Sequence, residues 1–385
     1  MKIERYHWHH YFGGIALLLL ILQLLSGIFL TLFYLPELER AYASVQMLYK
    51  ELPVGAWLRD AHRWVALALF GCIVVHIARS LLRKEFLNFD RRVVWLTGGL
   101  LLLPILALSV TGFILPWEWK GYWFMEMVPN HLGAIPLVGP TIKAFLIDAF
   151  TMSRNLVAHI IVFPVLALVL IEFHILARVR KRKGRLSGYL LKHLLIALPP
   201  LLVIDVLAFA LPMPTEDPDI LPMPLEGRQV PVAEWLYLAL LLPFLHFEGA
   251  IVPLLAIGLP LALFILLTAL PYFLGPGKNL RAKPEPVTEQ IVGKLARILG
   301  IGARSKALRG AVAFVAVLVL VAGVFGPLYS GVHQSPTYGC NSCHNVAMGT
   351  RMGVPPTAFK DRNVVPTLED NRWMVEHWFY PQVVW

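Results

Sequence analysis

Seven long apolar runs constrain this sequence more than any other feature. Roughly 20 apolar residues are enough to cross a lipid bilayer as a helix. Several of the runs contain proline, which transmembrane helices tolerate because neighbouring groups satisfy the freed backbone. The sequence therefore predicts an all-α membrane protein with seven transmembrane helices, expected at residues 11–34, 62–82, 93–115, 155–178, 188–211, 249–274 and 309–329.

The charged residues are few and unevenly placed. They make up 15% of the chain, whereas a soluble protein carries about 25%. The net charge of +10 resides in short loops between the apolar runs, which argues against a nucleic-acid partner. Lysine and arginine are concentrated after the second and fourth runs and before the seventh. The positive-inside rule then places the N-terminus in the cytoplasm, and seven spans place the C-terminus outside.

The first apolar run resembles a signal peptide in its position. It exceeds the usual signal core of about 7–15 residues, so we expect it to be a retained transmembrane helix.

A Cys-x-x-Cys-His motif, Cys340 to His344, lies near the C-terminus. Its spacing is typical of covalent haem c attachment, in which two thiols form thioethers and the histidine binds the iron. A zinc site would require two further ligands, and the remaining cysteine, Cys72, lies inside an apolar run. Haem c is attached on the outer side of bacterial membranes, where the charge rule also places this tail. Cys340, Cys343 and His344 are therefore predicted to hold haem c outside a bacterial cytoplasmic membrane.

The second axial ligand of this haem is left open between two residues. Met374 and His377 are three positions apart, so on a helix both would face the same side. Methionine would give a higher potential than histidine. The spacing does not choose between them.

Four histidines in the apolar runs form two matched pairs. His62 and His76 lie 14 residues apart in the second run, and His159 and His174 lie 15 apart in the fourth. At 100° per residue each pair returns to one face within about 40° and 60°, with about 21 Å between its members. Because both helices run from outside to inside, His62 pairs with His159 and His76 with His174. Each level is predicted to bind one haem b through two imidazoles.

Glycines recur in step with these histidines. Gly13 and Gly27 in the first run are 14 apart, as are Gly98 and Gly112 in the third. Glycine permits close approach of a flat macrocycle to a helix backbone, although small residues also serve plain helix packing. Three arginines near the expected haem edges are candidate partners of the propionates: Arg59, Arg79 and Arg154.

These residues resemble cytochrome b of the quinol-oxidising Rieske/cytochrome b complexes over residues 1 to about 330. The resemblance is greatest to the chloroplast-type branch, whose four-helix and three-helix subunits would here be fused into one chain. The segments that carry it are Arg59–His62, the step to His76, Thr111–Trp117, Arg154 before His159, the step to His174, and Ala134–Gly139. The resemblance implies a dihaem four-helix bundle (1–186) and a three-helix domain with the quinol-site loop (187–330). The Cys-x-x-Cys-His motif adds a haem c tail (331–385), which the ordinary family member lacks.

The resemblance also implies two quinone sites. The outer site oxidises quinol beside the His62/His159 haem, and the family carries a Pro-Glu-Trp-Tyr motif there whose glutamate takes a proton. This chain has Ala233-Glu234-Trp235-Leu236, which keeps the carboxylate. Glu234 is therefore the expected catalytic residue. The inner site, beside His76/His174, would reduce quinone, with Arg5, His7, His9 and His10 as the expected proton donors. A covalent third inner haem is not expected, because no cysteine precedes Cys72.

Two functional hypotheses remain open at this stage. The first is a quinol–cytochrome c reductase subunit with two haems b, one haem c and proton translocation, working as a homodimer with a Rieske-type iron–sulfur protein and c-type cytochrome subunits. The second is a transmembrane electron conduit without bifurcation, which the altered motif at Ala233–Leu236 favours. The sequence does not distinguish the quinone type.

Overall fold

The computed structural model describes residues 11–88, 91–117, 129, 132–133, 135–183, 186–211, 254–274 and 287–299, with scattered positions between 308 and 322. Every regular element in these ranges is helical, which confirms the predicted all-α class there. The helices are α1 (Phe12–Thr31), α2 (Leu38–Lys50), α3 (Gly55–Leu82), α4 (Arg92–Ile114), α6 (Gly139–Asp148), α7 (Met152–Val157), α8 (Phe163–Ile171), α9 (Ala177–Lys183), α10 (Leu186–Ala210), α13 (Leu259–Leu274) and α14 (Val287–Leu299).

Five helical segments of the described chain are long and apolar enough to cross a membrane: α1, α3, α4, the composite Met152–Arg180 and α10. They correspond to the first five expected spans. The sixth is represented by α13, a shorter apolar helix of 16 residues. Most of the seventh lies outside the described residues. A total of seven spans therefore stays a prediction.

Helix α3 begins at Gly55 rather than at residue 62, where its apolar run starts. The additional turns contain Arg59 and Asp60, which are 4% and 1% exposed. These two side chains form an ion pair with each other, and both are hydrogen-bonded to the Tyr49 hydroxyl of α2. Because these polar groups are satisfied within the protein, the helix continues beyond the apolar run.

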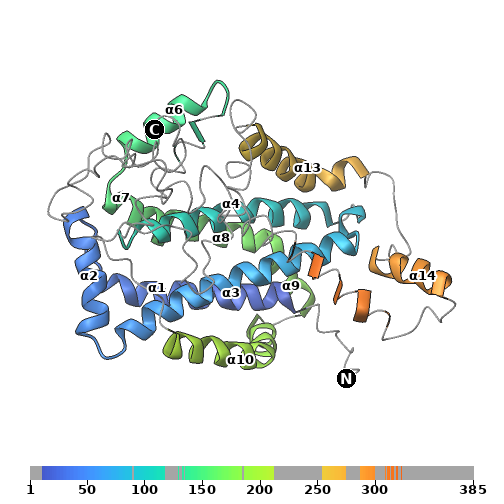
Figure 1. The fold of residues 1–385 in the computed structure, drawn as a ribbon, viewed down its shortest axis with the longest axis horizontal. Coiled ribbons are helices and arrows are strands. Elements are labelled where there is room, and N and C mark those ends of the chain that lie inside the picture. The colour runs from blue at the N-terminus through green and yellow to red at the C-terminus, as the bar shows by residue number, and fades with distance from the viewer. Residues whose placement is uncertain are drawn as a thin grey trace, which may run out of the picture.

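The long helices form a bundle in which α1 packs against α3 and α4 packs against α8. Figure 1 shows these four helices running along the long axis of the molecule. Helix α10 packs on α3 and α1, and α13 packs on α4. A buried apolar cluster lies among α1, α3, α4 and α8, with Leu20, Leu69 and Ile105 among its members.

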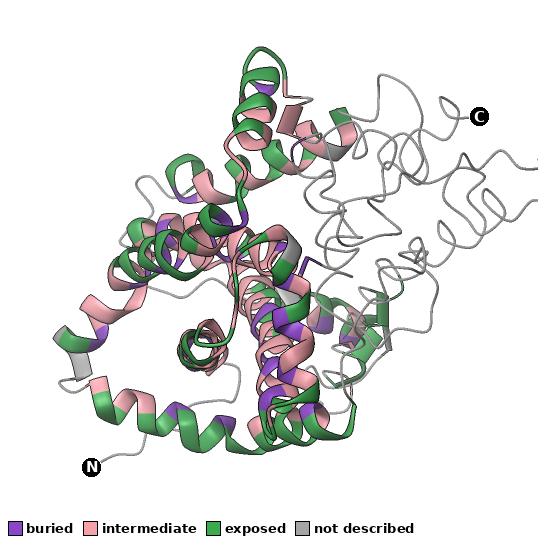
Figure 2. Ribbon diagram, turned by 90° about the vertical axis from the view of Figure 1, so that its left-hand side faces the viewer, coloured by how far each residue is buried: buried purple, intermediate pink, exposed green. Residues whose placement is uncertain are grey.

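Large apolar side chains also cover much of the molecular surface. Exposed positions recur along the long helices (Figure 2) and include Phe209, which is 82% exposed, and Val203, which is 57% exposed. A soluble protein rarely exposes contiguous apolar surface on this scale. Such a surface is suited to contact with lipid.

A side-chain hydrogen bond joins α13 to α4. Pro271 has no N–H to offer to the Leu267 carbonyl four residues earlier. Trp95 of α4 donates its indole N–H to this carbonyl at 2.7 Å. The proline in α13 is thus accommodated by a neighbouring helix, as expected for a proline in a transmembrane bundle.

Candidate functional site

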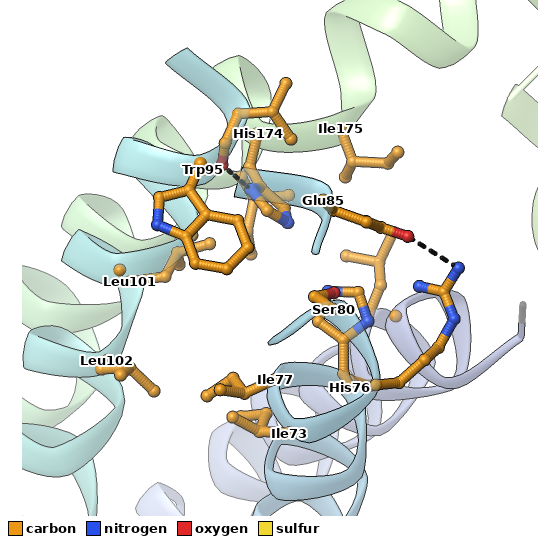
Figure 3. A pocket seen from close by; sticks show the side chains of 18 of the residues that line it. Ile73, His76, Ile77, Ser80, Glu85, Trp95, Leu101, Leu102, His174 and Ile175 are labelled. Carbon is orange, nitrogen blue, oxygen red and sulfur yellow. Dashed lines mark hydrogen bonds and ion pairs between the residues drawn. The ribbon is translucent and has the colours of Figure 1, made fainter. Parts of the chain in front are cut away.

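The inner histidine pair meets between α3 and the fourth span. His76 and His174 have ring centroids 6.3 Å apart and ring planes at 82°, and they face one another across a pocket in Figure 3. Metal–imidazole bonds are about 2.0–2.1 Å long, so two imidazoles bound on opposite sides of one metal ion have centroids roughly 6 Å apart. The observed separation fits a single iron held between the two rings.

The outer pair is His62 of α3 and His159 of the fourth span. These imidazoles lie close enough to interact electrostatically. Ser26 Oγ lies 2.7 Å from Nδ1 of His62, and Thr111 Oγ1 lies 3.0 Å from Nδ1 of His159. With Nδ1 engaged in both rings, Nε2 is the nitrogen left for a metal.

Each of the four histidines lies against the glycine that was predicted to share its level in the bundle. A Cβ atom on Gly13 would lie 3.0 Å from Cε1 of His76, and one on Gly98 would lie 2.8 Å from Cε1 of His174. The corresponding distances are 3.5 Å from Gly27 to His62 and 2.9 Å from Gly112 to His159. The glycines were predicted to admit a macrocycle. In the structure it is the imidazole ring itself that occupies the space beside each of them.

The fourth span is not a continuous α-helix. His159 lies in a π-helical turn, Ala158–Val162, and His174 lies in a second, Glu172–Leu176. A π turn closes its hydrogen bonds over one more residue than an α turn. The 60° offset calculated at 100° per residue therefore does not apply here. The additional residue in the 15-residue step is absorbed by the π turns, which often mark functional positions.

The two histidine levels are separated by the buried apolar cluster. Leu69 lies seven residues from both His62 and His76. Leu20 is likewise midway between Gly13 and Gly27, and Ile105 midway between Gly98 and Gly112. The space between the levels is thus filled by packed aliphatic side chains.

The inner pair opens into a cavity of about 1020 Å³. This volume is at the upper limit of ordinary ligand pockets, which occupy about 300–1,000 Å³. Arg79 lines the cavity and forms a 2.9 Å ion pair with Glu85 (Figure 3). Further basic residues in the lining are Arg91, Arg178 and Lys192. The positive charge suits an anionic or carbonyl-bearing ligand near the inner histidines.

A histidine that the sequence analysis did not single out lies in the same cavity. His193 of α10 is 5% exposed, and its Nδ1 lies 2.8 Å from the Tyr189 carbonyl. The Tyr11 and His193 ring centroids are 5.4 Å apart. A Cβ atom on Gly14 would lie only 2.0 Å from Cδ2 of His193. An ionisable side chain within an apolar helix is itself a functional signal, and this one was available in the sequence.

The two outer arginines differ in their surroundings. Arg59 lies three residues before His62, is buried, and donates from Nη1 to the Tyr49 hydroxyl at 2.5 Å. The Tyr49 hydroxyl in turn donates to the Asp60 carboxylate. Burial raises the pKa of Tyr49 to about 12, against the opposing attraction of the Arg59 charge. Arg154 is exposed and donates to the Ala149 carbonyl at 2.8 Å.

Comparison with known proteins identifies the bundle. The sequence profile of the family described as Cytochrome b/b6/petB matches residues 3–182. Cytochrome b6 of Heliomicrobium gestii is 34% identical over 167 residues, covering 42% of this chain and 78% of that protein. Cytochrome b6 of Emiliania huxleyi is 36% identical over 181 residues, covering 46% of this chain and 82% of that protein. This chain belongs to the cytochrome b/b6 family. It is accordingly a membrane-embedded electron-transport protein that binds haem b.

A solved structure shares the fold beyond the matched segment. The hyperthermophilic respiratory Complex III has a chain that aligns with a TM-score of 0.58 and 21% identity, covering 85% of this chain and 91% of its own length. The likeness therefore concerns the fold of more than the four-helix bundle alone.

Several predicted site residues of this cytochrome b lie outside the described residues. They are Glu234, Cys340, Cys343, His344, Met374 and His377. The basic N-terminal segment, residues 1–10, also lies outside them. Their roles stay predictions.

Proposed function

We propose that this chain is the cytochrome b subunit of a quinol-oxidising bc-type complex and that its bundle holds two haems b. His62 and His159 hold the outer haem, and His76 and His174 hold the inner one. The observation that carries the proposal is the 6.3 Å separation of the inner imidazoles. The same two helical segments also carry the second pair, His62 and His159. Haem iron supplies a one-electron carrier at each level.

The residues around the two levels perform distinct tasks in this proposal. The glycines bring the neighbouring backbones close to the rings, and the apolar cluster around Leu69 excludes water between the levels. Arg79 lines the inner cavity, and its guanidinium, which already pairs with the Glu85 carboxylate, is a group suited to bind a propionate. Arg59, one turn from His62, brings the corresponding charge to the outer level.

Quinol oxidation is assigned to the outer face. Quinol gives up two electrons and two protons there, and Glu234 takes one of the protons. One electron passes to a Rieske-type iron–sulfur protein, and the other crosses the bundle to the inner cavity. Quinone is reduced in that cavity, where Lys192 and His193 join residues 1–10 as candidate proton donors. The net result is proton release outside the membrane.

The C-terminal tail supplies an additional electron acceptor. Cys340 and Cys343 attach haem c, His344 binds its iron, and Met374 or His377 completes the coordination. The tail (331–385) then works beside the dihaem bundle (1–186) and the quinol-site domain (187–330), on the outer side of a bacterial cytoplasmic membrane. Further c-type cytochromes and a second copy of the complex are the expected partners.

The decisive experiment is quinol-driven reduction of the purified complex with an inhibitor blocking the inner quinone site. We expect the b and c haems to be reduced together and a pulse of oxidant to drive further b reduction. Glu234→Gln should slow this reaction strongly. Strictly serial reduction of b and then c, without oxidant-induced b reduction, would instead establish the non-bifurcating conduit. A haem content other than two b and one c would overturn the cofactor assignment.

A further inference from the structure

Three hydroxyl side chains lie beside the predicted haem ligands. Ser26 Oγ is 2.7 Å from Nδ1 of His62, and Thr111 Oγ1 is 3.0 Å from Nδ1 of His159. Thr97 Oγ1 is 3.5 Å from Nδ1 of His174. Each hydroxyl residue directly precedes the glycine that packs against the same histidine, namely Gly27, Gly112 and Gly98. The Ser/Thr-Gly pair thus contacts each of these rings through both of its residues.

The proton of each hydroxyl is already engaged within its own helix. Ser26 donates to the Leu22 carbonyl at 2.8 Å, Thr111 to Ala107 at 2.7 Å and Thr97 to Val93 at 2.8 Å. A hydroxyl has one proton but two acceptor lone pairs. Towards the histidine it therefore accepts, and the ring must carry its proton on Nδ1. This tautomer leaves the Nε2 lone pair free for iron.

We propose that Ser26, Thr111 and Thr97 are positioning residues that fix the tautomer of three haem ligands and lower the midpoint potentials of the haems. The inference rests on the proposed binding of haem by these histidines. An acceptor at Nδ1–H raises the basicity of the imidazole. A more basic ligand stabilises the oxidised iron, and hydrogen bonding around the ligands is one of the means by which a protein sets such a potential. Loss of the acceptor should therefore raise the potential.

The three histidines differ in whether Nδ1–H has another acceptor besides the hydroxyl. His174 also places Nδ1 2.8 Å from the Val94 carbonyl, which is closer than Thr97. His159 has the Leu108 carbonyl as an additional acceptor. His62 has Ser26 as its ring partner in the described part of the chain. Removal of the hydroxyl should therefore matter most at Ser26, less at Thr111 and least at Thr97.

Ordinary helix packing offers an alternative explanation for the hydroxyls, because serine and threonine commonly bond to the preceding turn. Ser109 provides the comparison. It lies on α4 between Thr97 and Thr111 and donates to the Ile105 carbonyl at 3.1 Å, but no described histidine is its partner. Ser109→Ala removes the same kind of intrahelical bond and leaves the haem ligands untouched.

The test is a redox titration of the purified complex, with the optical spectrum of each haem followed separately. Ser26→Ala and Thr111→Val should raise the midpoint potential of the outer haem, with the larger shift for Ser26→Ala, while the inner haem provides an internal reference. Thr97→Val should shift the inner haem only slightly, and Ser109→Ala should shift neither. Ser26→Thr keeps the hydroxyl, so the midpoint potential of its outer haem should equal that of the unmodified complex.

The possible failures have separate meanings. If the unmodified complex contains no outer haem b, the proposed function itself fails. If both haems are present but the potentials in Ser26→Ala and Thr111→Val equal that in Ser109→Ala, the tautomer assignment is overturned and the proposed function stands. If Ser26→Ala does not assemble, Thr111→Val tests the corresponding hydroxyl–imidazole bond at His159, the other proposed ligand of the same haem.

Discussion

Gly112 and His159 are in direct contact, and a single added Cβ atom at Gly112 would lie 2.9 Å from the ring carbon Cε1. This contact connects the third and fourth spans at the outer level. The same relationship recurs at the other three histidines with small differences in distance. These differences allow a graded test.

Alanine at Gly112 or Gly98 should lower the haem content of the complex. The new methyl group would lie 2.9 or 2.8 Å from an imidazole, so the ring or the helix must move. Overpacking of this kind costs about 1–3 kcal/mol. The ratio of haem b to protein, measured from pyridine haemochrome spectra, reports the effect.

Two further glycines control this prediction. Gly71→Ala in α3 should leave the haem content unchanged, because no described atom lies within 4 Å of the new Cβ. Gly27→Ala should be nearly tolerated, because its 3.5 Å distance to His62 is an ordinary contact. Because alanine favours a helix more than glycine does, helix propensity cannot explain a loss of haem. Equal haem content in all four variants would show that the contact with the imidazole ring does not limit haem binding.

Deletion of Ile161 should be tolerated better than deletion of Val169. Ile161 belongs to the π turn that contains His159, so its loss lets this turn close as an α turn. Val169 lies in the regular α8, where a deletion rotates every later residue by about 100° relative to the earlier ones. Retention of the inner haem after deletion of Ile161, and its loss after deletion of Val169, is the expected spectroscopic result. The reverse pattern would contradict the role given to the π turn.

Stability should fall between about pH 10 and pH 12 because of Tyr49. The pKa of Tyr49 is raised in the folded protein to about 12, from about 10 in an unfolded chain. The folded state thus holds the proton more tightly, so this contribution is complete below pH 10 and is lost as the pH rises towards 12. Thermal unfolding in detergent across this range measures the decline. Tyr49→Phe should make this decline shallower, and Tyr272→Phe, at a position that is 41% exposed, is the comparison variant.

Trp95→Phe should loosen the attachment of α13. The Leu267 carbonyl would lose its donor, and an unsatisfied group of this kind costs about 1–3 kcal/mol. In a Pro271→Ala background the restored N–H of residue 271 can bond to this carbonyl, so the same tryptophan substitution should cost less. A double-mutant cycle on thermal stability gives the coupling. A coupling free energy of zero would mean that the proline and the tryptophan act independently.

The positions of the histidines and glycines were predictable because both follow a helical repeat of about two heptads. His62 and His76 define one face of α3, and the matched glycines were found from the same spacing. The π turns at His159 and His174 were not predictable from a fixed angle per residue. They depend on how the fourth span packs between its neighbours.

The hydroxyl partners were missed for a different reason. Serine and threonine are common in membrane helices, and Ser26 differs from Ser109 only in which side chain approaches it in three dimensions. The early start of α3 was missed because a search for apolar runs excludes the buried pair Arg59 and Asp60. His193 was the one omission that the sequence already signalled.

The aliphatic layer at Leu20, Leu69 and Ile105 separates the two histidine levels without providing polar groups that could reorient around a charge. Two unit charges about 21 Å apart interact by about 0.8 kcal/mol at an effective dielectric constant of 20. An electron held at one level therefore makes the other level a weaker acceptor. With a haem at each level, as proposed, the two carriers would be electrostatically anticooperative, and the bundle would be better suited to pass electrons singly than to store a pair.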